Sequence, residues 1–296
     1  MKVVHTFEEV RDLAGGRIGL VPTMGFFHEG HLSLIKAAAE STDTVVVSVF
    51  VNPLQFNESG DLDAYPRDLD RDAALAETAG AQLLIAPADS YMYPRQHYTR
   101  IRVAGASDGM EGAYRSGHFD GVATVVAKLF AGVRPDVAFF GRKDAQQLAV
   151  VRALARDLSF PVEIRGLPIV RESDGLALSS RNIRLDGEIR GSALALSTAL
   201  FAASDAFEAG ERSVAALTHE AATRLGTHSG VETEYVEAAT ARDVAGVETI
   251  EAEVFLAVAA RIGNVRLIDN VHLNPGTGLA DRGVRLSEPS ILYGGP

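Results

Sequence analysis

Two histidines lie three residues apart in the segment Pro22-Thr23-Met24-Gly25-Phe26-Phe27-His28-Glu29-Gly30-His31. The apolar run 17–23 predicts a buried strand, and the run 32–41 predicts a helix. The first N–H groups of a helix and its positive dipole end attract anions, and histidine side chains add further hydrogen-bond donors. The segment therefore predicts a phosphate-binding turn. The alternative is that His28 and His31 are surface or capping residues.

A metal site is the other chemistry that two neighbouring histidines suggest. The order His28-Glu29-Gly30-His31 differs from the zinc motif HExxH, in which the histidines are four residues apart on one continuous helix. Here a glycine separates them, and no third ligand of a suitable type is evident. The sequence also has no G-x-x-x-x-G-K-[ST] phosphate loop, so a nucleotide would have to bind by another device.

A second polar string, Leu176-Ala177-Leu178-Ser179-Ser180-Arg181-Asn182, lies far downstream. Small hydroxyls beside an arginine suit phosphate binding, because the guanidinium offers a planar fork of donors. Alone, such a string is most often a simple turn. The pair of an H-x-G-H helix start and a later serine- and cation-bearing loop resembles the class I adenylyl-transferring superfamily, in which the two motifs hold a nucleoside triphosphate.

Three other strings follow predicted strands or precede a predicted helix. Asn52 and Gln55 follow the apolar run 43–51, so their amides are expected in the same cleft. Lys143 and Gln147 follow the run 136–140 and are four residues apart, hence on one helix face; a solvated lysine is the alternative. The segment 115–122 predicts either a gating loop or a capped turn.

The elements that must position these residues alternate along the first half of the chain. Short β-branched or apolar runs predict strands at 17–23, 43–51, 82–86, 136–140 and 162–166. Helical spacing predicts helices at 32–41, 69–79, 122–132 and 145–158. This alternation is typical of βαβ units, and it predicts an α/β fold with a Rossmann-like, doubly wound parallel sheet.

The pattern changes near residue 170, which predicts a Rossmann-like domain over 1–169 and a smaller α+β lid domain over 170–296. The alanine-rich stretch 187–226 predicts two helices separated at Gly210, and 231–271 predicts short strands around another helix. Glycine and proline recur after Asn274 through Gly295 and Pro296, which predicts a loop-like or partly disordered tail.

Composition excludes several classes of function. The 296 residues include 28 lysines and arginines against 39 aspartates and glutamates, a net charge of −11 that argues against non-specific binding to nucleic acid. The absence of cysteine excludes disulfides, thiolate metal sites and a cysteine nucleophile. No apolar run approaches the roughly 20 residues that span a bilayer. We therefore expect a cytoplasmic protein with no signal peptide and no membrane partner.

Six motifs occur in order between residues 18 and about 185: P-T-M-G-x-x-H-x-G-H, F-V-N-P-x-Q-F, D-x-D-x-Y-P-R, G-H-F-D-G-V, F-F-G-x-K-D-x-Q-Q and D-G-L-A-x-S-S-R-N. Together they resemble the pantothenate synthetase (pantoate–β-alanine ligase) family, with a weaker likeness through 266–270. The resemblance implies an AMP-forming ligase that uses ATP and Mg²⁺ to join pantoate and β-alanine through pantoyl adenylate. It also implies a homodimer.

The resemblance assigns roles to residues that match the family motifs. The catalytic positions are His28, His31, Lys143, Ser179, Ser180 and Arg181. The ATP site includes Met24, His31, Gly141, Lys143, Asp144, Leu178, Ser179, Ser180 and Arg181. Pantoate and β-alanine would contact Pro22, Thr23, Met24, Asn52, Gln55 and Gln147, and Asp72 matches an aspartate associated with Mg²⁺.

Two positions depart from the family pattern. Arg142 replaces the usual glutamate and adds a positive charge beside Lys143, and Leu178 replaces methionine with similar volume. We expect Arg142→Glu to keep activity within about tenfold. The rival interpretations are another adenylyl- or cytidylyltransferase of the superfamily and a nucleotide-sensing module without turnover.

Overall fold

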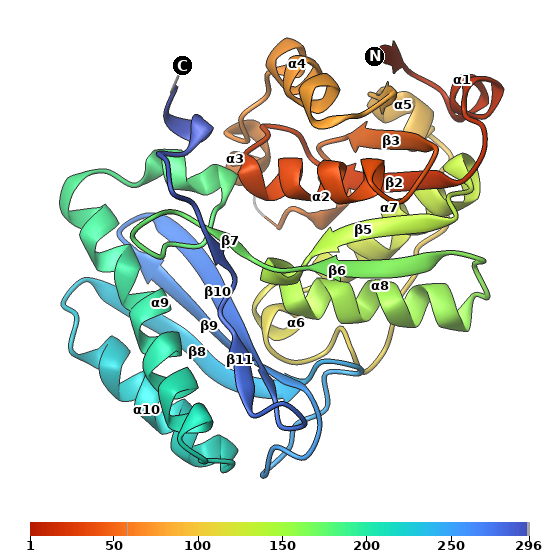
Figure 1. The fold of residues 1–296 in the computed structure, drawn as a ribbon. Helices are drawn as coiled ribbons and strands as arrows, with labels where there is room; N and C mark the ends of the chain where they lie inside the picture. The colour runs from red at the N-terminus through yellow and green to blue at the C-terminus, as the bar shows by residue number, and fades with distance from the viewer. Residues whose placement is uncertain (58, 295–296) are drawn as a thin grey trace. The chain divides into compact units, whose positions relative to one another are not determined.

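The computed structural model describes residues 1–57 and 59–294, so the predicted loop at Gly295 and Pro296 lies outside the described residues. Contacts between Cα atoms divide the chain into two units (Figure 1). The first comprises Met1–Phe27, His31–Gly141 and Val150–Leu167, and the second comprises His28–Gly30, Arg142–Ala149 and Pro168–Pro296. The predicted boundary after residue 169, as the limit of an independently folding domain, stays a prediction.

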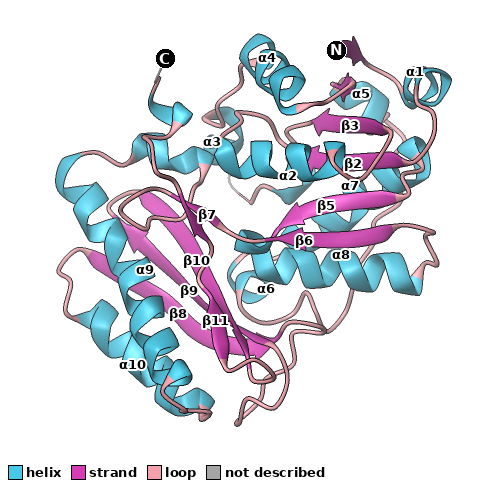
Figure 2. Cartoon of the chain, viewed as in Figure 1, coloured by secondary structure: helices cyan, strands magenta, loops and turns pink. Residues whose placement is uncertain are grey.

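A six-stranded parallel sheet forms the centre of the first unit, in the order β1-β4-β3-β2-β5-β6. Figure 2 labels its neighbouring strands β3, β2, β5 and β6. Its strands are β1 (Lys2–Val4), β2 (Ile18–Thr23), β3 (Thr44–Val49), β4 (Leu83–Ile85), β5 (Val137–Gly141) and β6 (Glu163–Leu167). The predicted doubly wound α/β fold is confirmed, and each of the five predicted strands is present. The short edge strand β1 was not predicted, because three residues carry no readable alternation.

Helices connect these strands, as the alternation predicts. They are α1 (Phe7–Leu13), α2 (Glu29–Ala39), α3 (Ser59–Asp63), α4 (Leu69–Ala79), α5 (Asp89–Met92), α6 (Glu111–Tyr114), α7 (His118–Val133) and α8 (Ala145–Asp157), with single 3₁₀ turns η1 (Pro53–Gln55) and η2 (Arg142–Asp144). Apolar residues of α2 and α4 pack on alternate residues of the strands, such as Val45 and Val47. This packing follows from the two-residue period of side chains along a strand.

The strand order reverses between β2 and β5. Chain order runs outward from β2 through β3 to β4, and then returns to the other side of β2 with β5 and β6. The two central strands pair only at Gly19–Val137 and Leu20–Ala138, so they are no longer paired at their carboxyl ends, Thr23 and Gly141. Ligands of doubly wound folds bind at such a reversal, outside the carboxyl ends of the strands.

The second unit contains two helices and an antiparallel sheet in the order β11-β10-β9-β8. Its elements are β7 (Val170–Arg171), η3 (Ser180–Arg184), α9 (Gly187–Glu208), α10 (Val214–Gly226), β8 (Val231–Thr240), β9 (Val254–Ile262), β10 (Val265–Asn274), β11 (Leu279–Asp281), β12 (Val284–Arg285) and η4 (Ile291–Tyr293). The predicted pair of helices around Gly210 is confirmed, and so is the α+β class.

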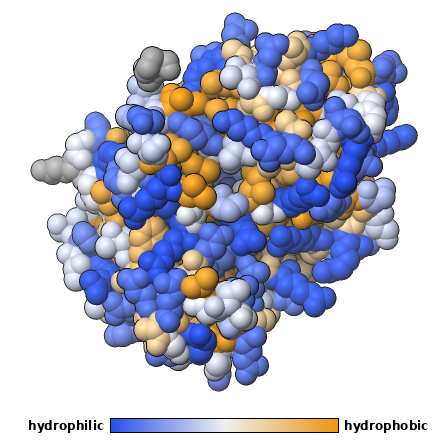
Figure 3. Space-filling view, in the orientation of Figure 1, coloured by the Kyte–Doolittle hydropathy of each residue, from blue (hydrophilic) through white to orange (hydrophobic). Residues whose placement is uncertain are grey.

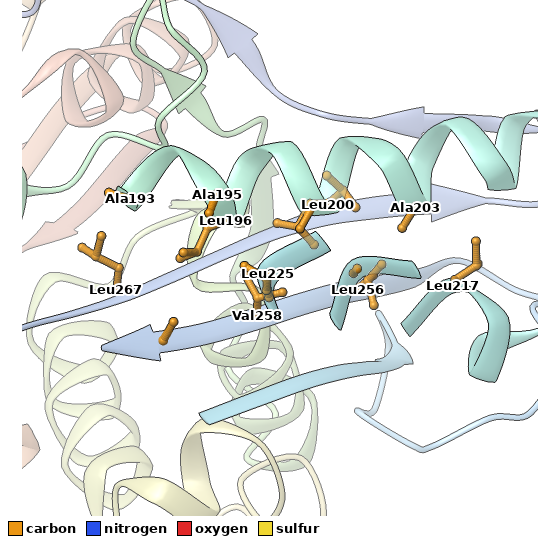
Figure 4. Close-up of a cluster of buried hydrophobic side chains, with 14 of the residues drawn as sticks. Ala193, Ala195, Leu196, Leu200, Ala203, Leu217, Leu225, Leu256, Val258 and Leu267 are labelled. Carbon is orange, nitrogen blue, oxygen red and sulfur yellow. The ribbon is translucent and has the colours of Figure 1, made fainter. Parts of the chain in front are cut away.

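The prediction of short strands around a helix over 231–271 is confirmed for the strands, but it is wrong about their length and about the helix. These residues form three long strands and no helix, and their alternate residues pack against α9 and α10. Figure 4 shows Leu256 and Val258 beside Leu196 and Leu200 of α9. Alanines such as Ala260 belong to this packed surface, because small side chains let the helices approach a sheet closely. The predicted helix is absent because the residues between these strands join them as turns of one sheet.

The tail after Asn274 is also more ordered than its composition suggests. β11 pairs with β10, β12 pairs with β7, and η4 follows.

The molecular face drawn in Figure 3 is largely hydrophilic. In the two described ranges, no helix combines the length and the apolar character needed to cross a membrane.

Candidate active site

The turn after β2 is built around an aspartate from another element. Asp72 lies in the first turn of α4, a helix that is capped by Asp68. The side chain of Asp72 is only 1% exposed. One oxygen of Asp72 accepts the backbone N–H of Phe26 and the other accepts that of Phe27, each at 2.6 Å. Burial raises the pKa of the Asp72 carboxyl, and these two amide donors act in the opposite direction. Asp72 therefore fixes the path of the turn.

The turn needs a glycine at its start. Gly25 has a φ of 88°, and a Cβ at this position would lie 2.9 Å from a carboxylate oxygen of Asp72. Phe26 follows with a φ of 53°, in the left-handed region that non-glycine residues rarely adopt. The guanidinium of Arg71 lies over the Phe26 ring, 5.0 Å from its centroid, and donates to the carbonyl of Phe27 at 3.0 Å. These contacts stabilise a strained backbone that sequence spacing does not reveal.

Asn52 and Gln55 lie where they are predicted, after β3, but their contacts differ. Asn52 is buried and donates from Nδ2 to Gln55 Oε1 at 2.9 Å and to the carbonyl of Gly121 at 3.1 Å. Its Oδ1 accepts from the hydroxyl of Tyr93 at 2.8 Å. Gln55 Nε2 in turn donates to Met24 Sδ at 3.2 Å. The structure thus brings Met24 and Gln55 together, with Asn52 as the residue that positions Gln55.

The G-H-F-D-G segment and the preceding Arg115 contact the backbone carbonyl of Gln55. His118 Nδ1 lies 2.8 Å from the carbonyl oxygen of Gln55, to which Arg115 also donates at 3.2 Å. His118 is the first residue of α7, so this part of the predicted gating loop or capped turn is helical. Gly121 is needed in that helix, since a Cβ there would collide with the backbone of Leu54 in η1.

The remaining residues of the turn have defined local contacts. His28 Nδ1 accepts the backbone N–H of Gly30 at 3.1 Å, so the hydrogen of a neutral His28 ring lies on Nε2. A Cβ on Gly30 would come within 2.8 Å of the same ring, which explains the glycine. His31 lies beside Phe27, with ring centroids 5.4 Å apart. Thr23 donates its hydroxyl to the carbonyl of Ser48 at 2.6 Å.

Lys143 belongs to the 3₁₀ turn η2, immediately before α8. The side chain of Asn270, in β10, donates to the carbonyls of Arg142 and Lys143 at 3.0 and 2.7 Å. Asn270 is therefore a positioning residue that the sequence only suggested, through the weak likeness around 266–270. Gln147 follows Lys143 by one turn and is partly exposed.

The serine-bearing loop is held by buried polar groups of the second unit. Ser179 caps η3 by accepting the N–H of Arg181 at 3.3 Å. Asn182 donates to Glu172 Oε1 at 2.9 Å and to the carbonyl of Ala177 at 3.1 Å. Leu178 is buried, and its N–H donates to the carbonyl of Val170 at 2.9 Å.

An ion pair inside the second unit supports this loop. Arg171 is fully buried and pairs with both carboxylate oxygens of Asp269, at 2.6 and 3.0 Å. It also donates to the carbonyls of Gly175 and Asn270 at 3.1 and 3.0 Å. Sequence reasoning missed Arg171, because no local pattern shows that an arginine finds a buried carboxylate 98 residues away.

Comparisons with known proteins agree with this arrangement. The sequence model of the pantoate-beta-alanine ligase family matches residues 2–272. The chain is similar to the pantothenate synthetase of Heliobacterium modesticaldum, with 51% identity over 264 residues that cover 89% of this chain and 93% of that protein. This chain belongs to the pantoate–β-alanine ligase family. The resemblance inferred from the six motifs is confirmed, and the activity is that of an ATP-dependent pantoate–β-alanine ligase.

Solved structures of family members share the fold. The pantothenate synthetase of Thermus thermophilus superposes with a TM-score of 0.89 at 45% identity, covering 93% of this chain and all of that one. The pantoate–β-alanine ligase of Francisella tularensis, solved in complex with β-γ ATP and β-alanine, gives a TM-score of 0.74 at 31% identity. That comparison covers 91% of this chain and 97% of that one.

Arg142, which departs from the family pattern, has its own partners. Its Nη1 lies 3.3 Å from Glu253 Oε1 and 3.3 Å from Asp281 Oδ2. The positive charge that the sequence places beside Lys143 is therefore matched by two carboxylates of the second unit. Glu253 also lies 3.2 Å from His272 Nδ1.

The site residues implied by the resemblance thus fall into two groups, one in each unit. The first unit contains Pro22, Thr23, Met24, His31, Asn52, Gln55, Asp72 and Gly141. The second contains His28, Lys143, Asp144, Gln147, Leu178, Ser179, Ser180 and Arg181. Their individual roles toward substrates stay predictions.

Proposed function

We propose that the chain joins its substrates in two steps. A carboxylate oxygen of pantoate attacks the α-phosphorus of ATP, and the bond to pyrophosphate breaks, which gives pantoyl adenylate. The amine of β-alanine then attacks the acyl carbon, the bond between that carbon and the phosphate oxygen breaks, AMP leaves, and the nitrogen loses a proton. No residue is assigned as the base that takes this proton.

One observation carries the proposal more than any other. The H-x-G-H turn follows the carboxyl end of β2, and η2, which contains Lys143, follows the carboxyl end of β5. These are the two strands between which the strand order reverses. Doubly wound sheets bind nucleotides at this place. Three side chains of these two turns, those of His28, His31 and Lys143, can donate hydrogen bonds to phosphate, which suits a reaction in which phosphate charge must be neutralised.

We assign the phosphates of ATP to His28, His31, Lys143, Ser179, Ser180 and Arg181. Displacement at phosphorus needs positioning and charge stabilisation rather than a covalent nucleophile on the protein. His28 supports this assignment, because its Nδ1 accepts from Gly30 and the ring therefore offers an N–H at Nε2. Met24, Gly141, Asp144 and Leu178 would line the rest of the nucleotide site.

We assign pantoate to Gln55, Gln147 and Met24, together with Pro22 and Thr23. The side-chain amide of Gln55 is held by Asn52 and Met24, and the contacts of His118 and Arg115 hold its backbone carbonyl. A side chain fixed in this way is preorganised to bind a hydroxyl or carboxylate oxygen. Asn52 acts through Gln55 in this proposal.

Mg²⁺ stays a prediction, and the donor set argues against a protein-held ion. Among residues 1–57 and 59–294, no group of three or more histidine, aspartate or glutamate side chains could hold a metal. Both oxygens of Asp72 accept backbone amides, so this residue has the contacts of a positioning residue. An ion bound to ATP phosphates and water would need few protein ligands, and it would neutralise part of the phosphate charge.

Exchange of labelled pyrophosphate into ATP tests the first step. We expect exchange that requires pantoate, and we expect His31→Ala to abolish it, whereas the exposed His219→Ala is the matched control. Exchange without pantoate would favour another adenylyltransferase. No exchange at all, with ATP still bound, would favour a nucleotide-sensing module.

Three further expectations belong to this proposal. A homodimer should appear in light scattering at micromolar concentration. A lid function of residues 170–296 should appear as different domain angles in the free and adenylate-bound forms. A cytoplasmic location is consistent with the absence of cysteine.

A further inference from the structure

A short segment beyond the part that matches the family model connects two of the ATP-binding motifs. The match ends at residue 272, and the segment Ser290–Tyr293, which we call the strap, follows 18 residues later. Its last three residues form η4, which begins where Ser290 Oγ accepts the N–H of Leu292 at 3.2 Å. Ser290 and Leu292 are buried, so the strap is part of the packed second unit.

One end of the strap binds the H-x-G-H turn. Ser290 donates its hydroxyl to Glu29 Oε2 at 2.7 Å, and the N–H of Ile291 donates to Glu29 Oε1 at 2.8 Å. Glu29 lies directly between His28 and Gly30, all three within the second unit. Hydrogen bonds to a carboxylate are among the stronger ones in proteins. Both oxygens of Glu29 are therefore tied to the strap.

The other end of the strap contacts Glu172, which also binds Asn182 of the serine-bearing loop. Tyr293 donates its hydroxyl to Glu172 Oε1 at 2.8 Å and accepts from Arg190 Nη1 at 2.9 Å. Glu172 is buried, and the same Oε1 accepts from Asn182, which follows Arg181 in the loop. Arg190 closes the network with a bond of 2.7 Å to Glu172 Oε2. Burial and the nearby carboxylate raise the pKa of Tyr293, which keeps its hydroxyl protonated as a donor.

We propose that the strap is a positioning element for ATP, which holds the His28–Gly30 part of the turn and the Ser179–Arg181 loop in a fixed relation within the second unit. Glu29, Ser290 and Tyr293 touch none of the three substrates in this proposal. They act through the backbone of the turn and through Glu172 and Asn182. The proposal rests on the assignment of the two motifs to ATP phosphates.

Steady-state kinetics of single variants test it. We expect Glu29→Gln, Ser290→Ala and Tyr293→Phe each to raise the KM for ATP by about three- to tenfold, since each loses a hydrogen bond to a carboxylate. The KM for β-alanine should change by less than about twofold, because the strap acts on the ATP motifs. Matched controls are Ser287→Ala and Glu288→Gln, two exposed residues just before the strap, and the exposed Tyr98→Phe.

A double variant separates positioning from general stability. Glu29→Gln combined with Ser290→Ala should raise the KM for ATP no further than Glu29→Gln alone, since both remove the same contact. Glu29→Gln and Tyr293→Phe act at opposite ends of the strap. The rise in the KM for ATP of the variant that combines them should be smaller than the product of the two single fold-changes. A drop in Tm with no change in any KM would overturn the proposal and leave a structural role.

The same experiment distinguishes failure of the strap from failure of the motif assignment. If His28→Ala and Ser179→Ala raise the KM for ATP while the three strap variants do not, only the strap proposal is wrong. If none of these variants changes the KM for ATP, the assignment of the motifs to ATP is wrong as well. Equal rises in the KM for ATP and for β-alanine would also contradict the strap proposal.

Discussion

Reversal of the charge at Arg142 should cost stability while it leaves catalysis nearly intact. Arg142→Glu would place a third carboxylate beside Glu253 and Asp281, which now lie 3.3 Å from the same guanidinium nitrogen. The guanidinium of Arg142 pairs with these two carboxylates and is assigned no contact with a substrate. We therefore expect kcat/KM to change by less than about tenfold. The effect should instead appear in the free energy of unfolding.

The exposure of the three side chains determines how much the two ion pairs contribute to the free energy of unfolding. They are 26%, 39% and 35% exposed, so water screens both pairs and each contributes about 0.2–1 kcal/mol. Arg142→Gln loses only these attractions, and we expect it to lower the free energy of unfolding by about 1 kcal/mol. Arg142→Glu adds two repulsions of similar size, so we expect a loss of about 2–3 kcal/mol.

Urea unfolding at neutral pH, in low salt and in 0.5 M NaCl (about a 4 Å screening length), measures the difference. The gap between the glutamate and glutamine variants should shrink in high salt, because it is electrostatic and partly exposed. Addition of Glu253→Gln and Asp281→Asn to Arg142→Glu should restore part of the stability. Equal stability of the glutamate and glutamine variants in low salt would refute the reasoning.

Three further substitutions test the contacts that shape the site. Asp72→Asn should lower the free energy of unfolding by about 2 kcal/mol, because one buried amide loses its charged acceptor; the exposed Asp70→Asn on the same helix is the control, and equal effects would contradict the role of Asp72. Gly121→Ala should cost about 1–3 kcal/mol by collision with η1, whereas Gly191→Ala, with open space around its Cβ, should stabilise α9 by about 0.5–1 kcal/mol in the same urea titration. Asp269→Asn should destabilise by about 3 kcal/mol or more in thermal or urea unfolding, since it leaves a buried arginine without its ionic partner; a change below about 1 kcal/mol would contradict this.

The sequence predicted what depends on local periodicity. The five predicted strands and four predicted helices of the first half of the chain, and the two helices around Gly210, follow from spacing that each segment carries by itself. The length of the strands over 231–271, and the absence of a helix between them, could not be predicted in the same way. Their alanine-rich residues adopt extended structure because a sheet packs on α9 and α10, and this packing involves residues distant in the sequence.

The same limit applies to the candidate site. Motifs identified residues such as His28 and Lys143 by type and order, but they did not identify what holds them. The resemblance names Asp72, but as a residue associated with Mg²⁺ and not as the acceptor that holds the turn. Asn270 lies in a region of weak likeness only, and no motif includes Glu172. Their importance comes from burial and from contacts across long stretches of chain.

The bond between Asp72 and the H-x-G-H turn has a consequence for how the enzyme acquires its activity. The carboxylate is 45 residues from Phe27, whose amide it binds, with α2, β3 and α3 between them. Contacts between such distant parts of a chain form late, after the intervening segments have collapsed and docked. A fragment that ends before α4 would contain both histidines and yet lack the turn. During refolding, ATP binding should therefore appear with tertiary assembly of the first unit, and later than the helical signal.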